Sequence, residues 1–167
     1  VVIAQSCEID YEISVPPEVR VVVDAHSGDV SAADLRSDQR LVLHSSAGDV
    51  AAERVVAPEL RASSSAGDVE LTELRAPRIE ATSSEGDVRA EVDTPLTRMV
   101  ARSSAGDVDV VVPEGVYALT ASAGAGDVRA GRVEAHAFEH RDDAFHAAGV
   151  GDRADDVLAL ADGHREL

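Results

Sequence analysis

The sequence of 167 residues contains no lysine and no tryptophan, and it has only two tyrosines and two phenylalanines. A compact globule of this size usually depends on aromatic side chains, because each of them buries a large apolar area. Their scarcity favours a thin, elongated core of Val, Ala and Leu. The single cysteine, Cys7, excludes an intrachain disulfide. No apolar run approaches the ~20 residues of a membrane helix, so membrane insertion is not predicted.

Basic residues are few as well: 15 arginines stand against 32 acidic residues, which gives a formal net charge of −17. Binding to nucleic acid or to anionic lipid needs clustered cations, so neither is predicted as a partner. Solubility or life in high salt explains such a composition. The alternative is an acidic surface that serves a basic partner or cations.

The strongest positive signal is the tripeptide Gly-Asp-Val, which occurs six times at intervals of 19 or 20 residues. A fixed period near 20 indicates stacked supersecondary units. The six aspartates of these tripeptides are Asp29, Asp49, Asp68, Asp87, Asp107 and Asp127.

Apolar and polar residues alternate on both sides of each of these aspartates. In the second repeat, Leu41, Leu43 and Ser45 precede the Asp at every second position, and Val50 and Ala52 follow it in the same rhythm. Such alternation is typical of half-buried strands. Each repeat is therefore predicted to contain a strand, a Ser/Gly-Asp corner, a second strand and a return loop rich in proline and charge.

One repeat is too short to bury its own apolar face, whereas stacked repeats bury a continuous column. We therefore predict one all-β domain over residues 1–167, a single-stranded β-helix (β-solenoid) with about 6–7 coils of 19–20 residues. Residues 1–20 are predicted to form N-terminal capping strands, and residues 21–130 the regular coils. Residues 131–167 are predicted to form a degenerate last coil and a C-terminal cap.

Three motifs stand out: Ile13-Ser14-Val15-Pro16 leading to Val21-Val22-Val23, Ser46-Ala47-Gly48-Asp49-Val50 with its copies, and Val112-Pro113-Glu114-Gly115. With them the sequence resembles a known family, the bacterial adhesin family of β-strand-repeat domains of unknown function. The resemblance covers residues 9–130 and implies a right-handed β-helix without enzyme activity. It also implies bacterial proteins that are often tied to the cell envelope or its stress responses, so localisation stays open between cytoplasm and envelope.

The six repeated aspartates are expected to stack, although carboxylates ~5 Å apart repel by about 1 kcal/mol even in water. The structural interpretation is that each carboxylate accepts a backbone N–H at its own corner. This would be an Asx-type turn after a glycine with positive φ. The alternative is a column of cations, because calcium prefers 6–8 oxygen ligands.

Two other groups invite a chemical interpretation. Serine pairs recur in the middle coils, and because a catalytic serine is normally single, a stacked hydroxyl ladder is predicted instead of a nucleophile. His136, His140 and His146 lie near Asp142 and Asp143, and zinc would need three or four such ligands. The segment is irregular and surface histidines are common, so no metal ligand is assigned. The serine pairs are Ser45-Ser46, Ser64-Ser65, Ser83-Ser84 and Ser103-Ser104.

The preferred function is a non-enzymatic scaffold whose outer faces bind a protein or an envelope polymer. No catalytic residue, cofactor or metal is assigned. The first alternative is a solenoid stabilised by calcium or other cations along the aspartates. The second is an enzyme acting on polysaccharide, but it would need a non-repeating carboxylate pair on an open face, and the sequence shows none. A weak cap would also allow end-to-end stacking between molecules.

Overall fold

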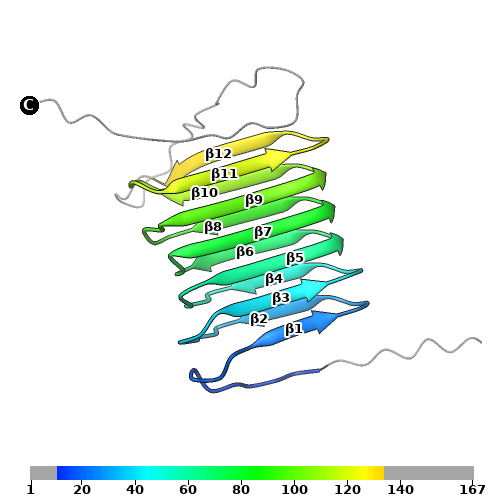
Figure 1. Ribbon diagram of the computed structural model, residues 1–167, viewed down its shortest axis with the longest axis vertical. Helices are drawn as coiled ribbons and strands as arrows, with labels where there is room; N and C mark the ends of the chain where they lie inside the picture. Colours follow the sequence, from blue (N-terminus) through cyan, green and yellow to red (C-terminus); the bar gives the residue numbers. More distant parts are fainter. Residues whose placement is uncertain (1–10, 134–167) are drawn as a thin grey trace, which may run out of the picture.

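The structure is a computed structural model that describes residues 11–133, and every regular element in this range is a β-strand. Twelve strands alternate along the chain between two parallel six-stranded sheets that face each other (Figure 1). Each coil contributes one strand to each sheet. Six stacked coils result, which confirms the predicted β-solenoid. None of the described residues belongs to a helix long and apolar enough to span a bilayer.

The strand boundaries follow the repeat. The first sheet consists of β1 (Val22–Ala25), β3 (Leu41–Ser45), β5 (Leu60–Ala66), β7 (Arg78–Glu85), β9 (Arg98–Ala105) and β11 (Ala118–Ala123). The second sheet consists of β2 (Val30–Ala33), β4 (Val50–Glu53), β6 (Val69–Leu74), β8 (Val88–Val92), β10 (Val108–Pro113) and β12 (Val128–Val133).

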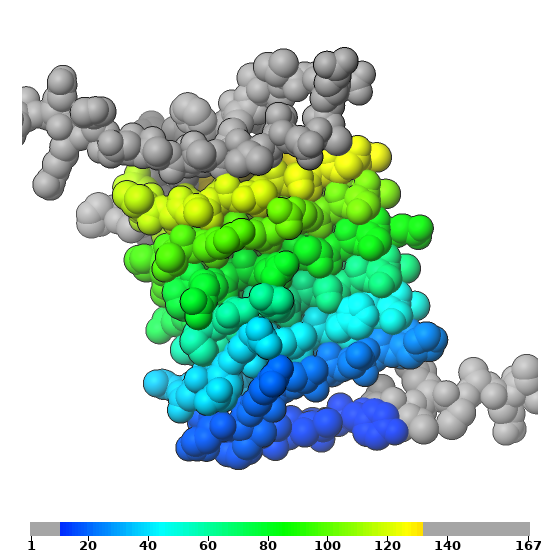
Figure 2. Space-filling model, in the orientation of Figure 1, coloured from blue at the N-terminus to red at the C-terminus, as the bar shows by residue number. Residues whose placement is uncertain are grey.

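Equivalent positions of successive repeats lie directly over one another. Leu60 pairs with Leu41 on one side and with Ile79 on the other, and Val69 pairs with Val50 in the second sheet. In both sheets each described strand pairs only with the equivalent strands of the coils directly before and after it, so no coil is skipped. Successive coils are in contact along the column (Figure 2). The constant period of the sequence therefore becomes a constant register in space.

The core lies between the two sheets and is thin, as the composition predicts. Along β5 and β8, buried and exposed residues alternate almost strictly, and Leu60, Leu71 and Met99 have no exposed surface. The valine after the repeated Asp is buried in the first five coils. In the sixth coil it is Val128, which is 39% exposed because no described coil covers it.

The predicted N-terminal capping strands are not found in residues 11–20, which form no strand. Pro16 and Pro17 have no N–H to donate to a ladder, and they begin a turn in which the Val19 N–H donates to the Pro16 carbonyl. The Pro17 carbonyl accepts the Asp38 N–H at 2.9 Å. This part of the segment therefore contacts the first coil through a loop. Residues 1–10 and 134–167, with the predicted C-terminal cap, Cys7 and His136, His140 and His146, lie outside the described residues.

Candidate functional site

The six glycines of the Gly-Asp corners form a column, and at five of them a Cβ would collide with the neighbouring corner. Their φ angles lie between 106° and 147°, where L-residues are strained. A Cβ on Gly86 would lie 2.3 Å from the carbonyl oxygen of Gly67 in the preceding corner. The corresponding distance at Gly106 and at Gly126 is 2.2 Å. At Gly28, in the first coil, a Cβ would meet nothing within 4 Å. The sequence predicted the positive φ but not this close stacking of backbones.

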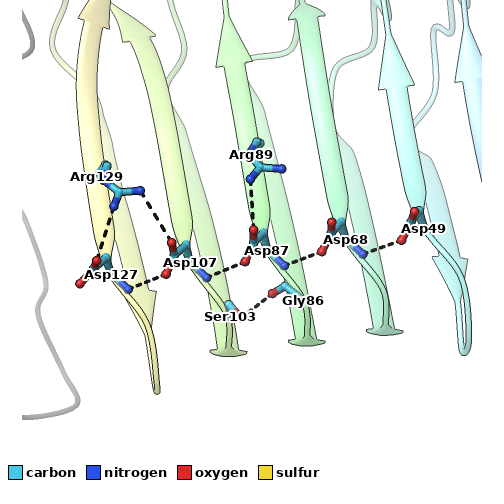
Figure 3. A network of polar contacts seen from close by, with 9 residues as sticks. All are labelled: Asp49, Asp68, Gly86, Asp87, Arg89, Ser103, Asp107, Asp127 and Arg129. Atoms are coloured by element: carbon cyan, nitrogen blue, oxygen red, sulfur yellow. Dashed lines mark hydrogen bonds and ion pairs between the residues drawn. The ribbon is translucent and has the colours of Figure 1, made fainter.

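The six repeated aspartates, here called the aspartate ladder, are joined by hydrogen bonds that run from coil to coil. Figure 3 shows the part of the ladder from Asp49 to Asp127. The backbone N–H of Asp49 donates to Oδ1 of Asp29 at 2.9 Å. The same bond recurs at each later step, with N···O distances of 2.7–2.9 Å. The prediction of an Asx-type turn inside each corner is therefore wrong. Stacking in register brings the next corner's N–H within reach of the carboxylate, and the bond forms there.

This arrangement offsets the repulsion between stacked carboxylates. Five of the six aspartates place Oδ1 on a backbone N–H, and hydrogen bonds to an ionised acceptor are strong. Arg89 lies 3.1 Å from Oδ2 of Asp87, and Arg129 lies 3.7 Å and 3.5 Å from Oδ2 of Asp107 and Asp127. Within residues 11–133, no group of three or more His, Cys, Asp or Glu side chains is arranged to hold a metal ion.

The first serine of each pair forms a second set of bonds between coils. These serines are buried, and the Ser83 hydroxyl donates to the Gly67 carbonyl of the preceding coil at 2.9 Å. The other three bonds measure 2.8 Å, and the one from Ser103 to Gly86 is drawn in Figure 3. The predicted ladder of hydroxyls is thus a set of hydroxyl-to-carbonyl bonds. The four serines, called the serine row, are Ser45, Ser64, Ser83 and Ser103.

A second corner was missed by the sequence analysis. Five residues after the Asp, the first three coils place Asp34, Arg54 and Glu73 in the left-handed region, at φ of 52–53°. Arg54 donates Nε and Nη2 to Asp34 Oδ1 and Oδ2 at 2.6 and 2.9 Å, and it also contacts Glu53. The hydrogen bond from Arg54 lowers the pKa of Asp34, and the same bond raises the pKa of Arg54. Both groups are exposed, so the pair adds little stability.

The outer faces of the two sheets differ in charge. On the outer face of the first sheet, β3 to β9 and the residues directly before β3 and β5 carry five arginines against Glu59 and Glu80, so this part of the face is positive. Asp24 on β1 is the other outward acidic residue of this sheet. Glu59 is shared, with Arg61 at 2.9 Å and Arg40 and Arg78 both at 3.7 Å. We call this surface the arginine face, and its arginines are Arg40, Arg61, Arg78, Arg98 and Arg102.

The opposite surface, the outer face of the second sheet, is acidic. Between β4 and β10 it carries Glu53, Glu70, Glu91 and Asp109, with Arg89 as its one arginine among those strands. The aspartate ladder lies at the start of the same strands. Arg54 contacts Glu53, Arg89 pairs with Asp87, and Arg129 on β12 pairs with Asp107 and Asp127. Glu70, Glu91 and Asp109 form no ion pair with any residue that the structure describes, so this side keeps a negative charge. Charge is thus unevenly distributed between the two sheet faces of the described surface.

Parallel coils stacked on Gly-Asp corners define this protein as a β-solenoid of short repeats. The model of the family described as Toastrack DUF4097 matches residues 5–153, and the chain belongs to this family, whose function is unknown. No curated protein and no solved structure matches the chain. The predicted relation to a β-repeat family of unknown function is confirmed, whereas the adhesin label is not part of the match.

Proposed function

We propose that this solenoid is a non-enzymatic scaffold whose outer sheet faces bind a partner. The observation that carries the proposal is that the repeated polar side chains bond to the backbone of a neighbouring coil. The aspartate ladder places Oδ1 on backbone N–H groups, and the serine row donates to backbone carbonyls. These groups, which are the repeated candidates for chemistry, serve to join coils.

The way the coils are joined makes the outer faces regular surfaces. Each coil is fixed to the next by two strand pairings, an aspartate bond and, in the middle coils, a serine bond. Outward side chains therefore repeat at the strand spacing of ~4.8 Å. Repeat proteins use such extended surfaces for binding. A protein or a polymer of the cell envelope fits a surface of this kind.

Affinity capture from soluble and envelope extracts of the source organism tests the proposal. The bait is the wild-type chain, and two variants each neutralise two outward charges on one face. Arg98→Gln/Arg102→Gln changes the arginine face, and Glu70→Gln/Glu91→Gln changes the acidic face. We expect a partner that is retained by the wild type and by one variant and lost with the other. No specific partner, or one that both variants retain fully, would count against a scaffold that works through its faces.

The enzyme alternative is tested separately. The chain is incubated with acidic and neutral polysaccharides, and new reducing ends are measured over time. We expect no release above a buffer control. Release that disappears when one outward carboxylate is replaced by its amide would show catalysis and overturn the proposal.

A further inference from the structure

We infer that the arginine face binds a linear polysaccharide that carries carboxylates. This inference rests on the proposed scaffold function and names the chemistry of its partner. It starts from an anomaly of charge: a chain with a formal net charge of −17 gathers five of its arginines on one sheet face.

These arginines are ordered along the solenoid axis. Arg78 and Arg98 are paired neighbours on β7 and β9, and Arg40 and Glu59 hold the equivalent position in the two preceding coils. Arg102 lies on the same face of β9, four residues after Arg98. Adjacent strands are ~4.8 Å apart, so the guanidinium groups follow the axis at short, regular intervals. The planar fork of a guanidinium matches a carboxylate through two hydrogen bonds.

Part of this charge is available to a partner. Arg40, Arg61 and Arg78 share Glu59, and Arg61 also lies 3.3 Å from Glu80. Arg98 and Arg102 are exposed and form no ion pair with any residue between 11 and 133. A polyanion is repelled by the aspartate ladder and by the acidic face of the second sheet. The electrostatic potential of the protein therefore steers a polyanion toward the arginine face.

The surface favours a polysaccharide over a peptide. The face lies on the flat of a sheet whose backbone groups are paired within the sheet, so an extended peptide cannot join it as a strand. Ser65, Ser84 and Ser104 form a row of exposed hydroxyls on the same face, where sugar hydroxyls find partners. A stiff polymer also loses less conformational freedom on binding than a flexible acidic peptide does.

Nucleic acid is less suited to this surface. Single-stranded nucleic acid is held by aromatic side chains on which bases stack, together with many cations. The strands of the first sheet contain no Phe, Tyr or Trp. Neutral sugars, which also stack on aromatic rings, are disfavoured for the same reason. A polysaccharide with a carboxylate on each sugar can pair its carboxylates with the arginines and its hydroxyls with the serines of this face.

The test measures the affinity of the full chain for polygalacturonate by titration calorimetry at low salt. Arg98→Gln/Arg102→Gln is compared with a matched control, Arg36→Gln/Arg75→Gln. Arg36 and Arg75 are also exposed and have no ion pair within the described range, but they lie on short bridges outside the two sheets. Both variants change the net charge by the same amount. We expect affinity to fall about tenfold in the first variant and less than about threefold in the control, because only the first loses direct contacts.

Each other outcome has a defined meaning. No binding of polygalacturonate by the wild type, or an equal loss in both variants, overturns the inference. So does equal affinity for a fully methyl-esterified polymer, which has no charge. Tighter binding of polyglutamate or of single-stranded DNA would assign the face to that polymer instead. If all polymers fail but the capture experiment yields a partner that depends on one face, the scaffold function stands and only this inference falls.

Discussion

Gly86 and Ser83 show how single residues hold neighbouring coils together. Gly86 allows its backbone to lie against the Gly67 carbonyl, at a distance that no Cβ tolerates. Ser83 turns its hydroxyl inward and donates to that same Gly67 carbonyl. A buried carbonyl without a donor is costly, so the serine row satisfies groups that the stacking of the glycines places inside the protein.

Replacing Gly86 by alanine is expected to destabilise the fold strongly, because the new Cβ meets strained backbone and the Gly67 carbonyl together. The free energy of unfolding should fall by about 3 kcal/mol or more, measured by urea denaturation. Gly28→Ala is the matched control, since it has positive φ but open space around its Cβ. Its loss should be about 1–2 kcal/mol, from backbone strain alone. Equal losses at both positions would contradict the role of close stacking.

The serine pairs offer a second comparison within two adjacent residues. Ser83→Ala removes the donor to the Gly67 carbonyl, and we expect a loss of about 1–2 kcal/mol in the free energy of unfolding. Ser84→Ala changes an exposed hydroxyl and should lie within about 0.5 kcal/mol of the wild type. Chemical denaturation of both variants under the same conditions decides. A larger effect at Ser84 would refute the assignment of the buried serine as the joining residue.

At the scale of the strands and their corners, the aspartate ladder links each Gly-Asp corner to the next along the start of the second sheet's strands. Asp68 accepts the Asp87 N–H at 2.7 Å while its own N–H donates to Asp49 at 2.8 Å. Each corner is thus both donor and acceptor, and the chain of bonds continues across the coils in one direction. The geometry needs an oxygen at Oδ1 and does not itself need a negative charge.

This geometry predicts different effects for two substitutions of Asp68. Asp68→Asn keeps an oxygen acceptor and removes repulsion from two neighbours, so stability should stay within about 1 kcal/mol of the wild type. Asp68→Ala leaves the Asp87 N–H without its acceptor and should cost about 1–2 kcal/mol. Thermal and urea unfolding measure both. If the amide is as harmful as alanine, the charge itself is required, and a ladder that binds cations becomes the better explanation.

Most of the strand pattern was predictable from the sequence, because stacking in register gives every repeat the same environment. Inward positions such as Leu41, Leu43 and Ser45 are therefore marked by residue type alone. The left-handed turn at Asp34, Arg54 and Glu73 was not predictable, because these positions lack the Gly or Asn that usually marks such a turn. The direction of the aspartate bonds depends on the neighbouring coil, which no single repeat encodes.

The arginine face was missed for a different reason. Net charge averages over all surfaces, so the sum of −17 argues against polyanionic partners such as nucleic acid even where one face is positive. The signal was present in the repeat, where an arginine occupies the position nine residues before the Asp in four of the six repeats: Arg20, Arg40, Arg78 and Arg98. Aligning charges by position, as was done for the apolar residues, would have located it.

For the whole molecule, the excess of acidic residues destabilises the compact state through self-repulsion. We expect the midpoint of thermal unfolding to rise by a few degrees between about 0.02 and 0.5 M NaCl, because salt screens charges beyond the Debye length. Calcium chloride at equal ionic strength should raise it no further, since five Oδ1 atoms of the aspartate ladder already accept N–H groups. A specific rise with calcium that a chelator reverses would contradict this expectation.

The uniform junction between coils also determines how the molecule can change in length. Excising residues 69–87 would join Asp68 to Val88, and Asp107 would then donate to Asp68 as it now donates to Asp87. Duplicating the same stretch would add one more identical junction. A gene that gains or loses one whole repeat therefore yields a rod longer or shorter by one strand spacing, about 4.8 Å. An odd number of residues inserted within a strand would turn the following inward side chains outward, so evolution or protein engineering should lengthen this rod by whole repeats.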